Sequence, residues 1–154
     1  MLSRERRARR RPHASHPRAR EAIRLLVDRL LPDGGCNYGN TSVLGQFLRP
    51  HIEPTGLVLT ALAGEPDQTG RIQRSLEFVA SNVGPDTTAA SLAYALIGLA
   101  AHDRWPKQAD AWLADAATRT ERWPGGLARR ALLTLAASGT ACPWITLTRK
   151  ANRT

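Results

Sequence analysis

The stretch that decides the fold is Pro32-Asp33-Gly34-Gly35-Cys36-Asn37-Tyr38-Gly39-Asn40, which stands between two segments of helical periodicity. The proline and the paired glycines end the preceding helix, because proline disrupts helical hydrogen bonding and glycine adopts backbone angles that other residues avoid. The asparagine side chains can hydrogen-bond nearby backbone groups, as they do in tight turns. We therefore predict a structural turn motif made of Asp33, Gly34, Gly35, Cys36, Asn37, Tyr38, Gly39 and Asn40.

Two kinds of helical segment alternate on either side of this turn. A single apolar stripe runs along segments 21–31, 71–83 and 109–116, whereas the apolar residues cover nearly the whole circumference of segments 55–63, 88–101 and 127–137. A helix with one stripe lies at the surface of a domain, while a helix that is apolar all round has to be covered on most sides. The sequence thus predicts outer and inner helices that take turns along the chain.

The three inner segments also share a register. Leu59-Thr60-Ala61-Leu62-Ala63 is followed 37 residues later by Leu96-Ile97-Gly98-Leu99-Ala100, and 36 residues after that by Leu132-Leu133-Thr134-Leu135-Ala136. Periods of this size are typical of stacked helical hairpins, in which neighbouring hairpins cover one another. We predict an all-α repeat domain of about six helices over residues 21–138, with a plain helical bundle as the alternative.

The net charge of +9 is concentrated at the two ends of the chain. Residues 1–20 contain eight arginines and one glutamate, residues 149–154 contain three basic residues, and residues 21–148 have a net charge of −1. We expect residues 1–20 to form a disordered Arg-rich arm and residues 139–154 a basic C-terminal tail, because these segments have little apolar surface to bury. The nearly neutral body argues against nucleic acid as the main partner, and association through the arm is kept as an alternative function.

Several classes of protein and site are not expected from this sequence. No apolar run reaches the roughly 18 residues of a transmembrane helix, and no apolar segment of the kind found in secretory signals follows the first arginines. Cys36 and Cys142 are isolated thiols, which fit a reducing compartment and a cytoplasmic protein. Asp33, Cys36 and His51 could be considered as zinc ligands, but they crowd into one loop, so we predict neither a metal site nor a cofactor.

The turn motif resembles a motif of the prenyltransferase and squalene-oxidase repeat proteins, a family that includes terpenoid cyclases and protein prenyltransferases. In these proteins an Asp-Gly-Gly-Trp-Asn-Tyr-Gly-Asn run precedes an inner helix that begins with Pro-Thr, as Pro54-Thr55 does here. The resemblance covers about residues 21–138. It implies stacked hairpins that form part of an α/α toroid, in which the turn braces adjacent helix pairs and Tyr38 supplies an anchoring ring.

The chain departs from the family pattern where catalysis is concerned. Cys36 stands where the family commonly has tryptophan, and no glutamine opens the motif before Pro32. The Asp-x-Asp-Asp run that protonates the substrate of squalene cyclases is also absent from the sequence. We therefore expect no catalytic residues and predict a degenerate, non-catalytic repeat protein that acts as a binding or interaction module.

A cavity and a partner would fit this interpretation. The resemblance implies an apolar, isoprenoid-like ligand, and the residues that we expect to line its cavity are Tyr94, Trp105, Trp112 and Trp123. The tryptophans also fit a role in packing outer helices against the core, since they lie at helix starts and on apolar stripes. The alternative from the enzyme class is one half of an isoprenoid-processing enzyme, in which a partner chain or a second copy completes the ring.

Overall fold

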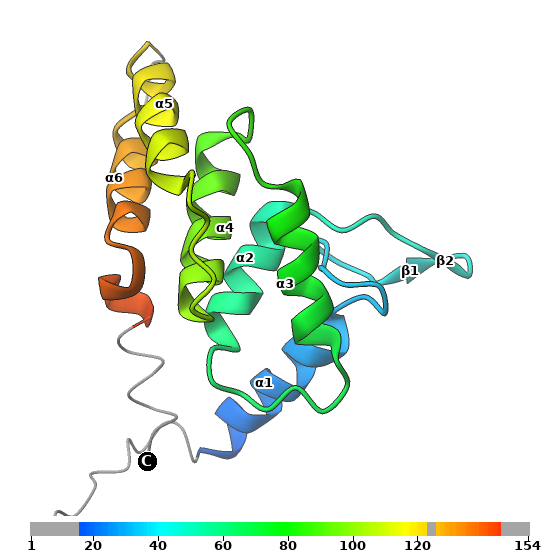
Figure 1. Ribbon diagram of the computed structural model, residues 1–154. Coiled ribbons are helices and arrows are strands. Elements are labelled where there is room, and N and C mark those ends of the chain that lie inside the picture. Colours follow the sequence, from blue (N-terminus) through cyan, green and yellow to red (C-terminus); the bar gives the residue numbers. More distant parts are fainter. Residues whose placement is uncertain (1–15, 123–125, 146–154) are drawn as a thin grey trace, which may run out of the picture.

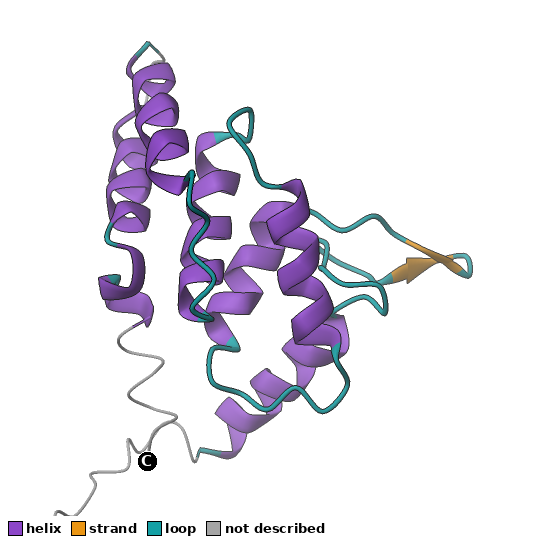
Figure 2. Cartoon of the chain, viewed as in Figure 1, coloured by secondary structure: helices purple, strands orange, loops and turns teal. Residues whose placement is uncertain are grey.

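The computed structural model describes residues 16–122 and 126–145, which form helices joined by loops (Figure 1). In chain order the elements are α1 (Pro17–Arg29), β1 (Ser42–Val43), β2 (Gln46–Phe47), α2 (Ile52–Ala61), α3 (Arg71–Asn82), α4 (Ala89–Ala101), α5 (Ala109–Glu121), α6 (Gly126–Ala137) and the 3₁₀ turn η1 (Gly139–Ala141). The prediction of an all-α domain is confirmed for the described part of the chain, in which the two strands form only a small hairpin (Figure 2). None of the helices described here is long and apolar enough to cross a membrane.

The first helix begins earlier than its apolar periodicity indicates. The Nδ1 atom of His16 accepts a hydrogen bond from the backbone N–H of Arg18 at 3.2 Å, and Pro17 takes the first helical position. Proline suits this position because its fixed φ angle is helical and no N–H is required there. Of the arm predicted over residues 1–20, residues 17–20 therefore belong to α1, and residues 1–15 lie outside the described part.

The predicted alternation of inner and outer helices is present in the structure. The inner helices α2 and α4 pack against each other, and α6 packs against the other side of α4 (Figure 1). The outer helix α3 contacts α2 and α4, while α5 contacts α4 and α6. Because the central helix α4 has neighbours on all sides, every residue from Ala95 to Ala101 is buried.

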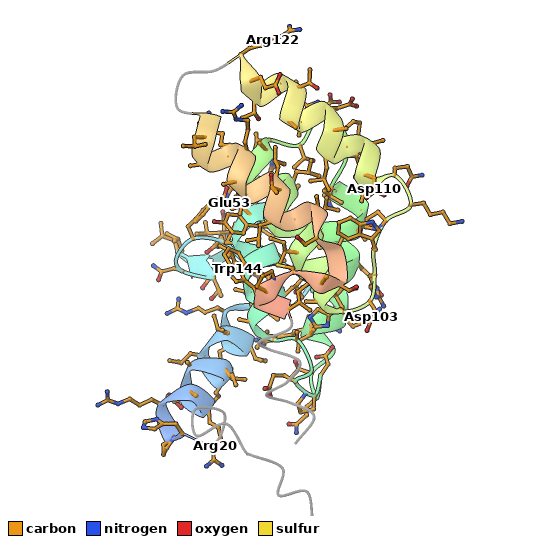
Figure 3. All side chains as sticks on the ribbon, turned by 90° about the vertical axis from the view of Figure 1, so that its left-hand side faces the viewer. Arg20, Glu53, Asp103, Asp110, Arg122 and Trp144 are labelled. Carbon is orange, nitrogen blue, oxygen red and sulfur yellow. The ribbon has the colours of Figure 1, made fainter. Side chains whose placement is uncertain are left out.

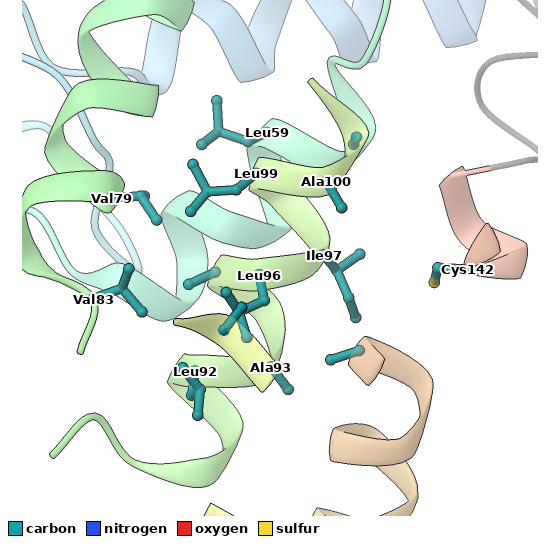
Figure 4. Close-up of a cluster of buried hydrophobic side chains, with 14 of the residues drawn as sticks. Leu59, Val79, Val83, Leu92, Ala93, Leu96, Ile97, Leu99, Ala100 and Cys142 are labelled. Atoms are coloured by element: carbon teal, nitrogen blue, oxygen red, sulfur yellow. The ribbon is translucent and has the colours of Figure 1, made fainter. Parts of the chain in front are cut away.

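Figure 4 shows that two opposite faces of α4 contribute side chains to the core. Leu96 and Leu99 are directed toward Val79 of α3, whereas Ile97 lies on the side that faces Cys142. All five side chains are almost completely buried. Burying a side chain of this size contributes roughly 1.5–3 kcal/mol, so this layer is a main source of stability.

The inner helices α2 and α4 approach each other closely at two glycines. Gly56 of α2 and Gly98 of α4 face each other where the helices cross, and a β-carbon added at Gly98 would lie 2.6 Å from the Gly56 carbonyl oxygen. A β-carbon added at Gly56 would overlap the backbone carbonyl of Tyr94. The two backbones are therefore in direct contact, which only glycine permits at these positions.

The third inner helix is less buried than its sequence predicts. α6 buries only Gly126, Leu133 and Ala136, and it exposes Arg129 and Arg130. In the described residues no further hairpin packs on its far side, so alanine, arginine and threonine side chains face solvent there together with Leu127.

The packed domain extends past residue 138, where we predicted its end. The turn η1 contacts α4, and both Cys142 and Ile145 are fully buried. A helical turn begins at Pro143. Within the segment predicted as a basic tail, residues 139–145 thus belong to the domain, and residues 146–154 lie outside the described part.

The segment between α1 and α2 contains a β-hairpin that projects from the helices (Figure 1). β1 and β2 are antiparallel, with Ser42 opposite Phe47 and Val43 opposite Gln46. Leu48 donates a further backbone hydrogen bond to the carbonyl of Thr41 at 3.0 Å. Strands of two residues are too short to show an alternating sequence pattern, which explains why this hairpin is not apparent from the sequence.

Candidate functional site

The structural turn motif connects α1, α2 and α3 through its backbone. Gly34 has a φ of 100°, and a β-carbon there would overlap the backbone carbonyl of Arg74 in α3. The Gly35 N–H donates a hydrogen bond to the buried Ser75 hydroxyl at 2.8 Å, and the Gly35 carbonyl accepts one from Leu31 at 2.8 Å. The paired glycines thus let the turn lie directly on α3.

Cys36 connects the same turn to α2. Its N–H donates a hydrogen bond to the Thr55 hydroxyl at 2.9 Å, and its carbonyl accepts one from the His51 N–H at 2.8 Å. The Thr55 hydroxyl in turn donates to the His51 carbonyl at 2.6 Å. Because Thr55 and Cys36 are both buried, these bonds are shielded from water, and the motif braces α2 against α3.

The second half of the motif is more exposed than we expected. The Tyr38 ring is 70% exposed, and its ring contact is with His51, at a centroid distance of 5.4 Å. Asn37 accepts a hydrogen bond from the Gly39 N–H at 3.0 Å, which forms the predicted local turn. The buried Cys36, rather than the Tyr38 ring, therefore anchors the motif, while Asn40 and Asp33 lie at the surface.

We expect Thr55→Val to lower the free energy of unfolding by about 1–3 kcal/mol, because it leaves the buried N–H of Cys36 without its acceptor. Chemical denaturation followed by circular dichroism would measure this loss. The matched control is Thr134→Val, since the exposed Thr134 hydroxyl also donates to the carbonyl four residues earlier, and this change should cost less than about 0.5 kcal/mol. Equal effects of the two substitutions would contradict the bracing role.

The thiol of Cys36 is poorly placed for chemistry. Burial raises its pKa above the usual value, and the hydrogen bond with Thr55 opposes this only in part. A protonated thiol is a weak nucleophile and a weak metal ligand. In the part of the chain that the structure describes, no three His, Cys, Asp or Glu side chains form a group that could hold a metal ion.

A second feature is an aromatic cleft on the side of the molecule formed by the inner helices. The rings of Tyr94 in α4 and Trp144 are stacked, with centroids 6.3 Å apart and planes inclined by 11°. They line a cleft of about 460 Å³, which we call the aromatic cleft. Its remaining lining residues are Glu53, Ala90, Ala128, Arg129, Ala131, Leu132 and Leu135.

The aromatic cleft combines an apolar floor with a few charged groups. Leu132 and Leu135 of α6 supply aliphatic surface beside the stacked rings. Glu53 of α2 and Arg129 of α6 add opposite charges, and Figure 3 shows Glu53 and Trp144 on the same face of the molecule. A mostly apolar concavity with a small number of polar groups is the usual composition of a small-molecule site.

The structure separates the four predicted cavity residues. Tyr94 lines the aromatic cleft, whereas Trp105 and Trp112 do not and instead pack partly buried against the hydrophobic core. Trp123 lies outside the described residues. Trp144 lies beside Tyr94 instead, although we predicted it to be part of the basic tail. The apolar residue next to it, Ile145, was the sequence signal that this segment packs against the core.

No family model, no curated protein and no solved structure matches the chain.

Proposed function

We propose that this chain is a non-catalytic helical-repeat module that binds an apolar, isoprenoid-like ligand in the aromatic cleft. The observation that carries the proposal is the stacked pair of Tyr94 and Trp144 over the aliphatic side chains of α6. We further propose that the three hairpins form part of an α/α toroid, with the aromatic cleft on its inner side. This is supported by the origin of the lining, which comes from α2, α4, α6 and Trp144 and includes no residue of α1, α3 or α5.

Binding fits the residues of the aromatic cleft better than catalysis does. Its volume of about 460 Å³ is within the range of small-ligand sites. Among the described residues that line it, Glu53 and Tyr94 carry groups of the kind that act as general acids or bases, and most of the others are alanine and leucine. Most of the lining is therefore apolar surface that can bury a ligand, which supports binding.

We expect Trp144→Ala to weaken the binding of farnesol about tenfold, because the substitution removes half of the stacked aromatic surface. Equilibrium dialysis against radiolabelled farnesol would measure the dissociation constant. Tyr38→Ala is the matched control, since it removes an exposed aromatic ring that does not line the aromatic cleft, and it should leave farnesol binding unchanged. A thermal melt of each variant would establish that both are folded.

Two results would contradict the proposal. The first is that the unmodified chain shows no saturable uptake of farnesol. The second is that Trp144→Ala, folded by circular dichroism, binds farnesol as tightly as the unmodified chain.

A further inference from the structure

The hairpin that projects from the helices carries an unusual amount of exposed apolar surface. Leu44 is 98% exposed, Phe47 66% and Val43 46%, and Leu48 is also exposed. We call the segment from Thr41 to Leu48 the apolar hairpin. It projects to one side of the helical body, away from α5 and α6 (Figure 1). Exposed apolar surface concentrated in this way marks a site of interaction rather than a random surface composition.

The apolar side chains lie on both faces of the apolar hairpin and at its tip. Ser42 and Phe47 are directly opposite in the antiparallel pair, so their side chains share one face. Val43 and Gln46 share the other face, which Leu48 joins by the alternation of the strand. The connecting turn places Leu44 at the end of the ribbon. The hairpin is therefore a wedge with apolar side chains on both of its faces and at its tip.

The tip of the wedge contains a leucine in a conformation that leucine rarely adopts. Leu44 has a φ of 50° and Gly45 a φ of 79°, the positive pair that is typical of a tight hairpin turn. Asparagine or glycine is favoured at the first of these positions, because a β-carbon is strained there. Leu44 is therefore neither buried nor in a relaxed backbone conformation, so it does not stabilise the fold. This indicates that Leu44 contacts another molecule.

The charge around the wedge is complementary to an anionic surface. Between Asp33 and Glu53 the sequence contains no carboxylate, and Arg49 follows directly after the hairpin. At the start of the same loop the Arg29 guanidinium donates a hydrogen bond to the Gly39 carbonyl at 3.1 Å and is thereby held near the hairpin base. Arginine at the border between apolar and aqueous regions can interact with lipid phosphates while its aliphatic part stays in apolar surroundings.

We propose that the apolar hairpin docks this protein on the surface of a phospholipid membrane by inserting its tip. The distance from the hairpin base to its tip corresponds to about three residues, or about 10 Å at roughly 3.3 Å per residue. Interfacial segments of peripheral proteins enter the boundary between headgroups and acyl chains to a depth of about 5–10 Å. The wedge is therefore long enough to place Leu44 and Phe47 among the first methylene groups while Arg49 stays at the headgroups.

The distribution of apolar groups favours lipid over a protein partner. A protein surface, or a second copy of this chain, would cover one face of the hairpin and leave the apolar side chains of the other face in water. Acyl chains surround an inserted wedge from every side, and so they cover Phe47, Val43 and Leu44 together. The apolar hairpin is separate from the aromatic cleft, whose lining includes none of its residues.

The test uses the full chain, co-sedimentation with vesicles, and three variants. Leu44→Asn removes the apolar tip and places a residue that tolerates positive φ in the turn, so we expect unchanged or higher thermal stability. Its binding to vesicles of equimolar phosphatidylcholine and phosphatidylserine should be weaker by about tenfold. Adding Phe47→Thr to this variant should weaken it by about a further tenfold. The matched control is Leu127→Asn, which makes the same change at a leucine of α6 that is 73% exposed, and it should bind as the unmodified chain does.

The arginine-rich first residues are present in all variants, so their electrostatic attraction to anionic vesicles cancels in the comparison. Raised salt weakens that attraction, whereas the contribution of the hairpin should persist. Equal vesicle binding by Leu44→Asn and the unmodified chain would overturn the proposal, and so would a lack of vesicle binding by the unmodified chain. Self-association in the absence of lipid that Leu44→Asn abolishes would also overturn it, because the hairpin would then bind a second copy.

Discussion

Gly98→Ala is expected to lower the free energy of unfolding by about 3 kcal/mol, or the melting temperature by about 10 °C. Its new β-carbon would lie 2.6 Å from the carbonyl oxygen of Gly56, so α2 and α4 would have to move apart. These two helices form the most extensive interface between helices in the described part of the chain. Alanine is favoured over glycine within a helix by about 1 kcal/mol, but this gain is smaller than the loss of packing. Thermal unfolding followed by circular dichroism would measure the change.

The control for this prediction is Gly84→Ala. Gly84 precedes α4, its φ is not positive, and a β-carbon there would have no atom within 4 Å. Its N–H, which donates to the Thr87 hydroxyl at 2.9 Å, is kept by alanine. This variant should be as stable as the unmodified chain or slightly more stable. If Gly98→Ala melted together with it, the backbone contact between α2 and α4 would not exist in solution.

The second large effect is expected at the structural turn motif. Gly34→Ala combines two costs, because the residue has a φ of 100° and its β-carbon would overlap the Arg74 carbonyl. We expect a loss of about 3 kcal/mol in the free energy of unfolding, measured by urea denaturation. The substitution should also separate the turn from α3 and thereby weaken the adjacent hydrogen bond from Gly35 to Ser75.

Gly39→Ala provides the comparison within the same motif. Gly39 does not have a positive φ, and a β-carbon there would meet no atom within 4 Å. The loss should stay below about 0.5 kcal/mol, as at most surface positions. A similar sensitivity of both glycines would mean that the motif acts as a flexible linker and not as a brace between α2 and α3.

The helices and their inner or outer position could be predicted from the sequence, because apolar periodicity reports how much of a helix is covered. For α6 the same apolar periodicity predicted more burial than the structure shows, because among the described residues no other helix covers its far side. The α2–α4 contact was not predicted, although Gly98 lies in the repeated register. A close approach of two backbones depends on where helices cross, and this is a property of the tertiary structure.

The candidate site was only partly predictable. Tyr94 was identified as an aromatic residue on an inner helix, which is a local property. Its partner Trp144 follows a proline and lies near the basic residues 149–154. Because of this charge, the segment was predicted to be a tail and not a part of the packed domain. The apolar hairpin was hidden for a different reason, because Leu44-Gly45 lacks the asparagine that usually marks such a turn.

The central position of α4 limits how a chain of this kind can change its length during evolution. In arrays whose repeats contact only their neighbours, a unit can be duplicated or deleted with a roughly additive effect. The middle hairpin of this chain supplies α4, which α2 covers on one side and α6 and η1 on the other. Excision of residues 71–101 would therefore remove two interfaces at once, and it would leave the Gly56 backbone opposite a helix with no matching glycine. Loss of this middle unit is therefore expected to destabilise the domain more than loss of a unit at either end.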